Sequence, residues 1–125
     1  MRTAISAVII KERKILLVKK EEFWILPGGK PEPEESDLDC LCREVREELS
    51  GTELKNVRYY GEFEGITPRK GYLLKAKVYF AEIISSLGLP AAEISAREWV
   101  DDTGPYKMSD ITAKIIDSLR KDQYL

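Results

Sequence analysis

Histidine is absent from the sequence, and cysteine occurs only at Cys40 and Cys42. Zinc sites need ligands of these two types, and a serine or cysteine nucleophile needs a histidine base, so both kinds of site are excluded. Cys40 and Cys42 lie two positions apart in a stretch with helical spacing, so they point to nearly opposite faces and cannot form a disulfide. We expect free thiols, as in a reducing cytosol. Any catalysis must use carboxylates, lysine, tyrosine or a metal ion.

Long apolar runs and an excess of positive charge are also lacking. The apolar stretch Ala4 to Ile10 contains Ser6 and is followed at once by the charged residues 11–14, so it is too short for a signal peptide or a membrane span. The formal net charge is -2, which gives no uniformly basic surface to hold long nucleic acid. A small anionic ligand remains open if local cations or metal ions supply the charge. We therefore expect a cytoplasmic protein that binds no membrane and no long nucleic acid.

The composition suits one globular domain over residues 1–125, because 43% of the 125 residues are hydrophobic and 34% are charged. No internal repeat, low-complexity tract or linker divides it. Apolar runs predict a hairpin of strands over residues 3–10 and 14–19, and further strands over 23–26, 56–66, 72–84 and 94–100. Helical spacing predicts one helix from Glu34 and a second helix that Ser109 caps. These elements indicate a single α/β domain.

The first predicted helix carries an apolar stripe and an acidic face. Ser36 or a neighbouring acid can cap its start, and Gly51 can end it. The apolar stripe consists of Leu38, Leu41, Cys42, Val45 and Leu49. Glu44 reaches Glu47 at i+3 and Glu48 at i+4, so three carboxylates lie close together and repel one another. A hard divalent cation such as Mg²⁺ or Mn²⁺ removes this repulsion, and it can bridge phosphate oxygens and activate water.

An acidic helix face with interspersed arginines is also common as plain solvated surface, so the carboxylates alone leave both interpretations open. The segment Pro27-Gly28-Gly29 before the helix favours a site. It breaks regular structure and lets the backbone approach other groups closely. A backbone carbonyl there can complete the shell of a metal ion.

The spacing of these residues resembles the Nudix box, the motif of the Nudix hydrolase family that includes the MutT-like proteins. Gly29 is followed after five residues by Glu35 and after seven more by Arg43-Glu44-Val45-Arg46-Glu47-Glu48, and Leu26-Pro27-Gly28 precedes it. The resemblance implies an α/β/α sandwich in which a mixed β-sheet is flanked by helices. The family pattern has a glycine two residues past the glutamate pair and then an apolar residue, where this chain has Ser50-Gly51. The departure affects the loop after the helix, since every charged position of the box is present.

The resemblance also implies roles for single residues. Glu47 and Glu48 would be the principal ligands of Mg²⁺ or Mn²⁺, Glu44 a ligand or the base that orients water, and the Gly28 carbonyl a further ligand. Arg43 would assist catalysis as a support, because at i+4 it can pair with Glu47 and hold its rotamer. The other supports in the box are Gly29 and Glu35.

Two residues outside the box are further candidates. Glu82, at the end of a predicted strand, resembles the position from which many members take a base or an extra metal ligand, although a rim glutamate is an equally good interpretation. Lys20, at the end of the second predicted strand, can contact a phosphate as a point charge, but a plain surface lysine is the commoner outcome. The aromatic candidates for stacking a base, which can equally belong to the core, are Phe23, Trp24, Tyr72 and Phe80.

The resemblance implies a metal-dependent hydrolase that cleaves a phosphoanhydride bond of a nucleoside diphosphate linked to another group. We expect a nucleoside triphosphate, which gives a monophosphate and pyrophosphate. Hydrolysis of ADP-ribose, to which Pro68 points, and of dinucleoside polyphosphates, to which Tyr72 points, are alternatives, although Pro68 is well explained as a turn proline. The rivals from other classes are a non-catalytic nucleotide-sensing module and a purely structural α/β domain. A monomer and a homodimer both remain open.

Overall fold

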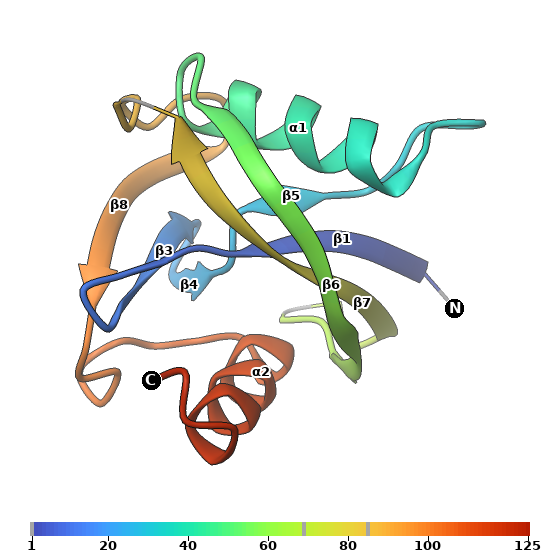
Figure 1. The fold of residues 1–125 in the computed structure, drawn as a ribbon. Helices are drawn as coiled ribbons and strands as arrows, with labels where there is room; N and C mark the ends of the chain where they lie inside the picture. Colours follow the sequence, from blue (N-terminus) through green and yellow to red (C-terminus); the bar gives the residue numbers. More distant parts are fainter. Residues whose placement is uncertain (1, 69, 85) are drawn as a thin grey trace.

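The computed structural model describes residues 2–68, 70–84 and 86–125. Over these residues the chain forms two four-stranded sheets and two helices (Figure 1). The strands are β1 (Arg2–Val8), β2 (Ile10–Lys11), β3 (Lys14–Lys20), β4 (Phe23–Ile25), β5 (Gly28–Gly29), β6 (Glu53–Ile66), β7 (Leu73–Ile84) and β8 (Ile94–Val100). The helices are α1 (Asp37–Glu48) and α2 (Asp110–Lys121), and no helix in the described ranges is long and apolar enough to cross a membrane.

The first sheet is mixed, as the resemblance implied. Its strand order is β5-β1-β7-β6, and its pairs are antiparallel except for β1 and β7, which run parallel. In the second sheet β3 pairs antiparallel with β2, β4 and β8. The hairpin predicted over residues 56–66 and 72–84 is present as β6 and β7, with β6 beginning earlier, at Glu53.

The predicted hairpin between residues 3–10 and 14–19 is only partly correct. β1 ends at Val8 and pairs with β5 and β7, while Ile10 and Lys11 alone pair with β3. The turn has the conformation of a tight hairpin, since Glu12 and Arg13 have φ of 52° and 62°. β1 and β3 each bury side chains on both faces, so each takes a central position in its own sheet.

Alternation along β3 places one helix on each face of the strands. The core on the α1 side includes Leu16, Val18, Leu41 and Val45. The core on the α2 side includes Ile15, Leu17, Ile115 and Ile116. Successive residues of a strand point to opposite faces, so the apolar run of β3 serves both cores. The strands lie between α1 and α2 in Figure 1, which confirms the α/β/α arrangement.

Helix α1 begins later than predicted, and of the predicted stripe Leu41, Val45 and Leu49 are buried. Ser36 caps it by accepting a hydrogen bond from the Asp39 backbone N at 3.1 Å, and Glu34, with φ of 64°, lies outside the helix. The buried side chains of the helix are Cys40, Leu41, Val45 and Glu48. Leu38, predicted to be buried, is 50% exposed. The helix is therefore turned so that Glu48 faces inward, which a hydrophobic pattern cannot show because it counts glutamate as polar.

The helix still closes at the Ser50-Gly51 departure. The backbone N of Gly51 donates to the Arg46 carbonyl at 2.9 Å, and Ser50 and Gly51 have φ of 22° and 78°. A helix usually ends with one left-handed residue, most often glycine, just past its last turn. Here two successive residues supply that turn, so the departure leaves the carboxylates of α1 on one regular helix.

Strand β5 brings the box glycines beside β1. Gly28 lies opposite Ser6 in the antiparallel register and has φ of 143°, a conformation that side chains rarely adopt. A Cβ atom at this position would overlap the carbonyl oxygen of Ile5. Only glycine therefore fits between β1 and the loop that leads to α1.

We predict that Gly28→Ala destabilises the protein by about 3 kcal/mol or more, because the new methyl group forces the two strands apart. The matched control is Gly71→Ala, since Gly71 also has a positive φ, 67°, but a Cβ there meets nothing within 4 Å. Its cost is the backbone strain alone, about 1 kcal/mol. Urea unfolding of both variants measures the difference, and equal losses would contradict the close approach of β5 to β1.

Candidate active site

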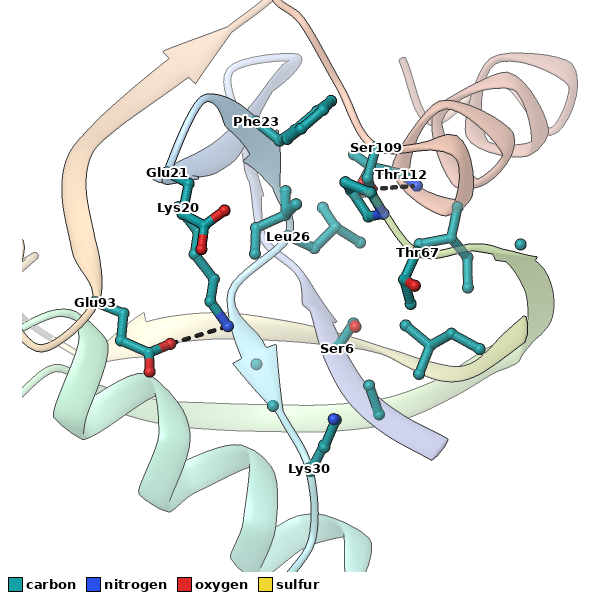
Figure 2. Close-up of a pocket in the computed structure, with 18 of the residues that line it drawn as sticks. Ser6, Lys20, Glu21, Phe23, Leu26, Lys30, Thr67, Glu93, Ser109 and Thr112 are labelled. Atoms are coloured by element: carbon teal, nitrogen blue, oxygen red, sulfur yellow. Dashed lines mark hydrogen bonds and ion pairs between the residues drawn. The ribbon is translucent and has the colours of Figure 1, made fainter. Parts of the chain in front are cut away.

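A cavity of about 610 Å³ opens where α1, the two sheets and the start of α2 meet. The box residues that line it are Gly28, Gly29, Glu44, Glu47 and Glu48. Its other walls come from the ends of β3 and β4, the β6–β7 turn and the start of α2. Figure 2 shows Lys20, Phe23, Thr67 and Ser109 around this space, each from a different part of the chain.

Glu48 is the buried carboxylate of the site. Its side chain is only 9% exposed, and it accepts a hydrogen bond from the Gly28 backbone N at 2.9 Å. Burial raises the pKa of Glu48 to about 8, against the lowering effect of that hydrogen bond, and the charge of Glu44 raises it further. A cation near Glu48 would stabilise its charged form.

Glu44 packs directly on the box loop. A Cβ atom at Gly29 would overlap the Glu44 carboxylate, so a glycine is required for this contact. The Cys40 thiol donates to the Gly29 carbonyl at 3.6 Å and holds the loop from the helix side. Burial raises the pKa of Glu44, and the hydrogen bond from Arg43 opposes that shift. Both cysteines are free, as predicted.

Arg43 connects three carboxylates of the box. Its Nε and Nη2 donate to the two oxygens of Glu35 at 2.8 and 2.9 Å, and its Nη1 donates to Glu44 at 2.9 Å. The expected i+4 contact with Glu47 is present but longer, at 3.5 Å. The hydrogen bond from Arg43 lowers the pKa of Glu35 to about 2. Arg43 thus connects the loop that carries Glu35 to the glutamates of α1.

The donor set suits a hard divalent cation, because the box side chains at the wall, Glu44, Glu47 and Glu48, all offer carboxylate oxygens. The buried Glu48, whose neutral form is favoured without a cation, points the same way. No three His, Cys, Asp or Glu side chains in the described ranges already surround a common point. Glu44 and Glu47 turn toward Arg43, and Glu48 turns toward Gly28. Holding an ion therefore requires these side chains to rotate from their present partners.

Lys20 lines the same cavity, and its Nζ forms an ion pair with Glu93 at 2.9 Å (Figure 2). The hydrogen bond to Glu93 raises the pKa of Lys20, although burial opposes the shift. Sequence reasoning missed Glu93, which lies in the loop before β8. The pairing of Lys20 with Ile94 across β3 and β8 brings it to the cavity, and no local motif marks that register.

The structure does not bring Glu82 to the other candidates, so its prediction as an extra base or ligand needs correction. Glu82 accepts a hydrogen bond from Asn56 at 2.8 Å and lines a second, smaller cavity with Arg58 and Tyr124. Position along the strand explains this separation. Leu74, near the start of β7, lines the main cavity, whereas Glu82 lies eight residues further along β7, beyond the part that pairs with β1.

The aromatic candidates divide between cavity and core. Phe23 and Tyr72 line the cavity. Trp24 packs edge-on against Tyr106 with ring centroids 5.1 Å apart, and Phe80 is buried. Any stacking with a bound base is therefore left to Phe23 and Tyr72.

Comparisons with known proteins agree with this geometry. The family model of the NUDIX domain matches residues 1–114. An uncharacterized Nudix hydrolase of Bacillus subtilis, YvcI, is 28% identical over 127 residues, which cover 96% of this chain and 80% of the relative. The CTP pyrophosphohydrolase of Escherichia coli is 40% identical over 55 residues, 39% of this chain and 41% of that protein. The crystal structure of a MutT NUDIX hydrolase from Burkholderia pseudomallei is similar to this structure, with a TM-score of 0.81 and 27% identity. The match covers 93% of this chain and 95% of the Burkholderia chain.

The chain belongs to the Nudix family, because the family model covers nearly all of it and the box lies at the wall of the main cavity. It is a pyrophosphohydrolase of that family, and family members use divalent cations and act on small nucleotide compounds.

We predict that Glu48 makes the metal-free protein less stable as the pH rises. Its folded pKa of about 8 lies above the ordinary value of 4.5, so the folded chain binds more protons than the unfolded chain between these values. Its contribution is full below about pH 4.5 and is lost as the pH approaches 8, by at most about 1.4 kcal/mol per pH unit.

The check is urea unfolding in a chelator at about pH 5 and about pH 8, with Glu48→Gln as the comparison. The amide can still accept the Gly28 hydrogen bond but does not titrate. We expect the wild type to lose more stability over this interval than the variant. Parallel losses would show that Glu48 titrates normally.

Proposed function

We propose that this protein hydrolyses nucleoside triphosphates to the monophosphate and pyrophosphate with Mg²⁺ or Mn²⁺. The observation that carries the proposal is one cavity that joins three box carboxylates to an apolar end. The apolar end is lined by Phe23, Leu26, Ile111 and Ile115. A nucleotide has the matching polarity, with an anionic phosphate chain and a flat base. The similarity to a CTP pyrophosphohydrolase supports the same substrate class.

In this proposal Glu47, Glu48 and the Gly28 carbonyl would hold the metal, and Glu44 would be a further ligand or the base. The bound cations neutralise charge that develops on the phosphates and lower the pKa of water. Arg43 keeps Glu44 and Glu47 within reach of each other and, with Glu35, fixes the loop that carries Gly28 and Gly29. Glu48 supplies a buried charge whose position is set by the Gly28 backbone.

The reaction adds water to a phosphorus atom and breaks the bond to the bridging oxygen, which leaves with the electron pair as part of pyrophosphate. A carboxylate of the wall accepts the proton of the water. Glu44 is the candidate, because its pKa is raised by burial and it lies against the box loop. Lys20 is the candidate phosphate contact, and it exchanges its ion pair with Glu93 for the substrate.

Alternative substrates share the site. Pro68 and Tyr72, which pointed to ADP-ribose and dinucleoside polyphosphates, both line the cavity. A nucleotide-sensing module would bind the same compounds without cleaving them. An assay panel of nucleoside triphosphates, nucleotide sugars, ADP-ribose and dinucleoside polyphosphates with Mg²⁺ separates these possibilities, and tight binding without turnover would favour the sensor.

We predict that Glu47→Gln lowers kcat by about a hundredfold or more, because it removes one charged metal ligand while keeping the shape of the side chain. Released monophosphate and pyrophosphate, separated by ion-exchange chromatography, give the rate. Equal turnover by the wild type and this variant would refute the site.

Two further variants serve as controls. Glu53→Gln removes an exposed glutamate that pairs with Arg46 and does not line the cavity, and we expect full activity. Glu82→Gln tests the corrected position of Glu82, and we expect full activity here as well. A large loss in Glu82→Gln would reinstate Glu82 as part of the machinery.

A further inference from the structure

Three cations surround Tyr72 at the edge of the cavity, and we call Arg2, Lys30, Lys70 and Tyr72 the Tyr72 rim. The Arg2 guanidinium lies over the Tyr72 ring at 4.3 Å from its centroid and donates to the Tyr72 hydroxyl at 3.0 Å. The Lys30 ammonium lies 5.9 Å from the same centroid. Lys30, Lys70 and Tyr72 line the cavity, whereas Arg2 contacts Tyr72 without lining it.

The charges of the rim lack carboxylate partners. Among residues 2–68, 70–84 and 86–125, no Asp or Glu forms an ion pair with Arg2, Lys30 or Lys70. By contrast, Lys20 lines the same cavity and pairs with Glu93. Although burial alone would raise the pKa of Tyr72, the charges of Arg2, Lys30 and Lys70 lower it below its usual value. The rim is therefore a region of uncompensated positive potential.

Arg2 and Tyr72 lie further along the first sheet from the box than Lys30, which directly follows Gly29 and whose carbonyl accepts a hydrogen bond from Arg43. In the register of the first sheet Gly28 lies opposite Ser6, while Arg2 lies beside Leu74, close to Tyr72. Arg2 and Ser6 are four residues apart on β1, about 13 Å of strand. Figure 2 shows the Lys30 side chain beside β1. An extended anion can thus contact the carboxylate-held metal ions at one end and the lysines at the other.

We propose that the Tyr72 rim binds the terminal phosphate of the triphosphate chain and makes the enzyme prefer nucleoside triphosphates to diphosphates. The inference rests on the proposed function and deepens it. Lys30 and Lys70 contact the phosphate oxygens as point charges. Arg2 adds charge and fixes the Tyr72 ring, so that the hydroxyl keeps its place at the rim. When the bond to be cleaved lies at the box carboxylates, a nucleoside diphosphate has no third phosphate to contact the Tyr72 rim.

The test compares kcat/KM for the triphosphate and diphosphate of one nucleoside in the wild type, Lys70→Gln and Arg2→Gln. We expect each variant to lose about fivefold to tenfold in kcat/KM for the triphosphate, mainly through KM, and to keep its value for the diphosphate. Lys14→Gln is the matched control, because it removes an exposed lysine of β3 that does not line the cavity. Lys14→Gln should leave kcat/KM unchanged for both the triphosphate and the diphosphate. Arg2→Lys should keep part of the triphosphate preference, because it keeps the positive charge.

Melting temperatures of the variants should match the wild type, so a folding defect is distinguishable. Equal losses for both nucleotides, or no loss for either, overturn the inference while the proposed hydrolysis stands. If the wild type turns over no nucleotide, the proposed hydrolysis fails. The role of the rim is then tested by measuring nucleotide binding with calorimetry. The probes are the α,β-methylene analogues of the same triphosphate and diphosphate with Mg²⁺. A triphosphate preference that Lys70→Gln removes supports the rim, and equal affinities overturn it.

Discussion

The guanidinium group of Arg43 is the interaction on which the geometry of the site depends. It donates hydrogen bonds to both carboxylate oxygens of Glu35 in the box loop and to one oxygen of Glu44 on its own helix. It also lies 3.5 Å from a carboxylate oxygen of Glu47. The planar group presents its donors as a fork, so one side chain can hold carboxylates from two segments at fixed angles. The helix consequently keeps neighbouring glutamates that would otherwise repel one another. The loop with Gly28 and Gly29 is held against the same helix.

This arrangement gives each box carboxylate a partner within the protein. Glu44 and Glu47 lean on Arg43, and the buried Glu48 receives the Gly28 N–H group. In the proposed site a metal ion would compete with these partners, which would lower its net affinity but leave a folded site before the ion arrives. At Glu48, burial disfavours the charged carboxylate and raises its pKa to about 8. A cation bound beside Glu48 would offset this cost of burying the charge.

The box itself was accessible from the sequence because it is local. Spacing along one helix places Glu44, Glu47 and Glu48 within one turn of each other, and Ser36 caps that helix as predicted. Burial of Glu48 was not accessible, since the hydrophobic pattern assigned that position to the polar face. Glu93 and the Tyr72 rim were missed for another reason, because the register between distant strands brings them to the cavity. The position of Glu82 also depends on pairing between distant strands, because the register of β7 with β1 leaves Glu82 beyond the end of their shared ladder.

The first predicted hairpin shows that strand pairing also limits prediction of the fold from the sequence. The runs 3–10 and 14–19 both have strand character, and the tight turn between them forms. Each run is nevertheless apolar on two faces, and a two-stranded hairpin could not cover both faces of either. The chain therefore leaves the first sheet after Val8 and enters the second at Ile10. That crossing separates the two sheets, and Val8 and Ile10 on its two sides line the smaller cavity.

The layout of charge in this cavity also sets the direction in which a nucleotide can enter. In the proposed function, Glu44 and Glu47 would make one end repel phosphate until cations neutralise it, whereas the lysines of the Tyr72 rim attract phosphate throughout. A phosphate chain that spans both ends would contact carboxylate-bound cations at one end and lysine side chains at the other. A nucleotide reversed in the cavity would set its uncharged nucleoside against the rim cations and leave them without a counter-charge. Since unpaired charges lose hydration without compensation, the reversed orientation is disfavoured, and the metal ions become necessary for orientation as well as for chemistry.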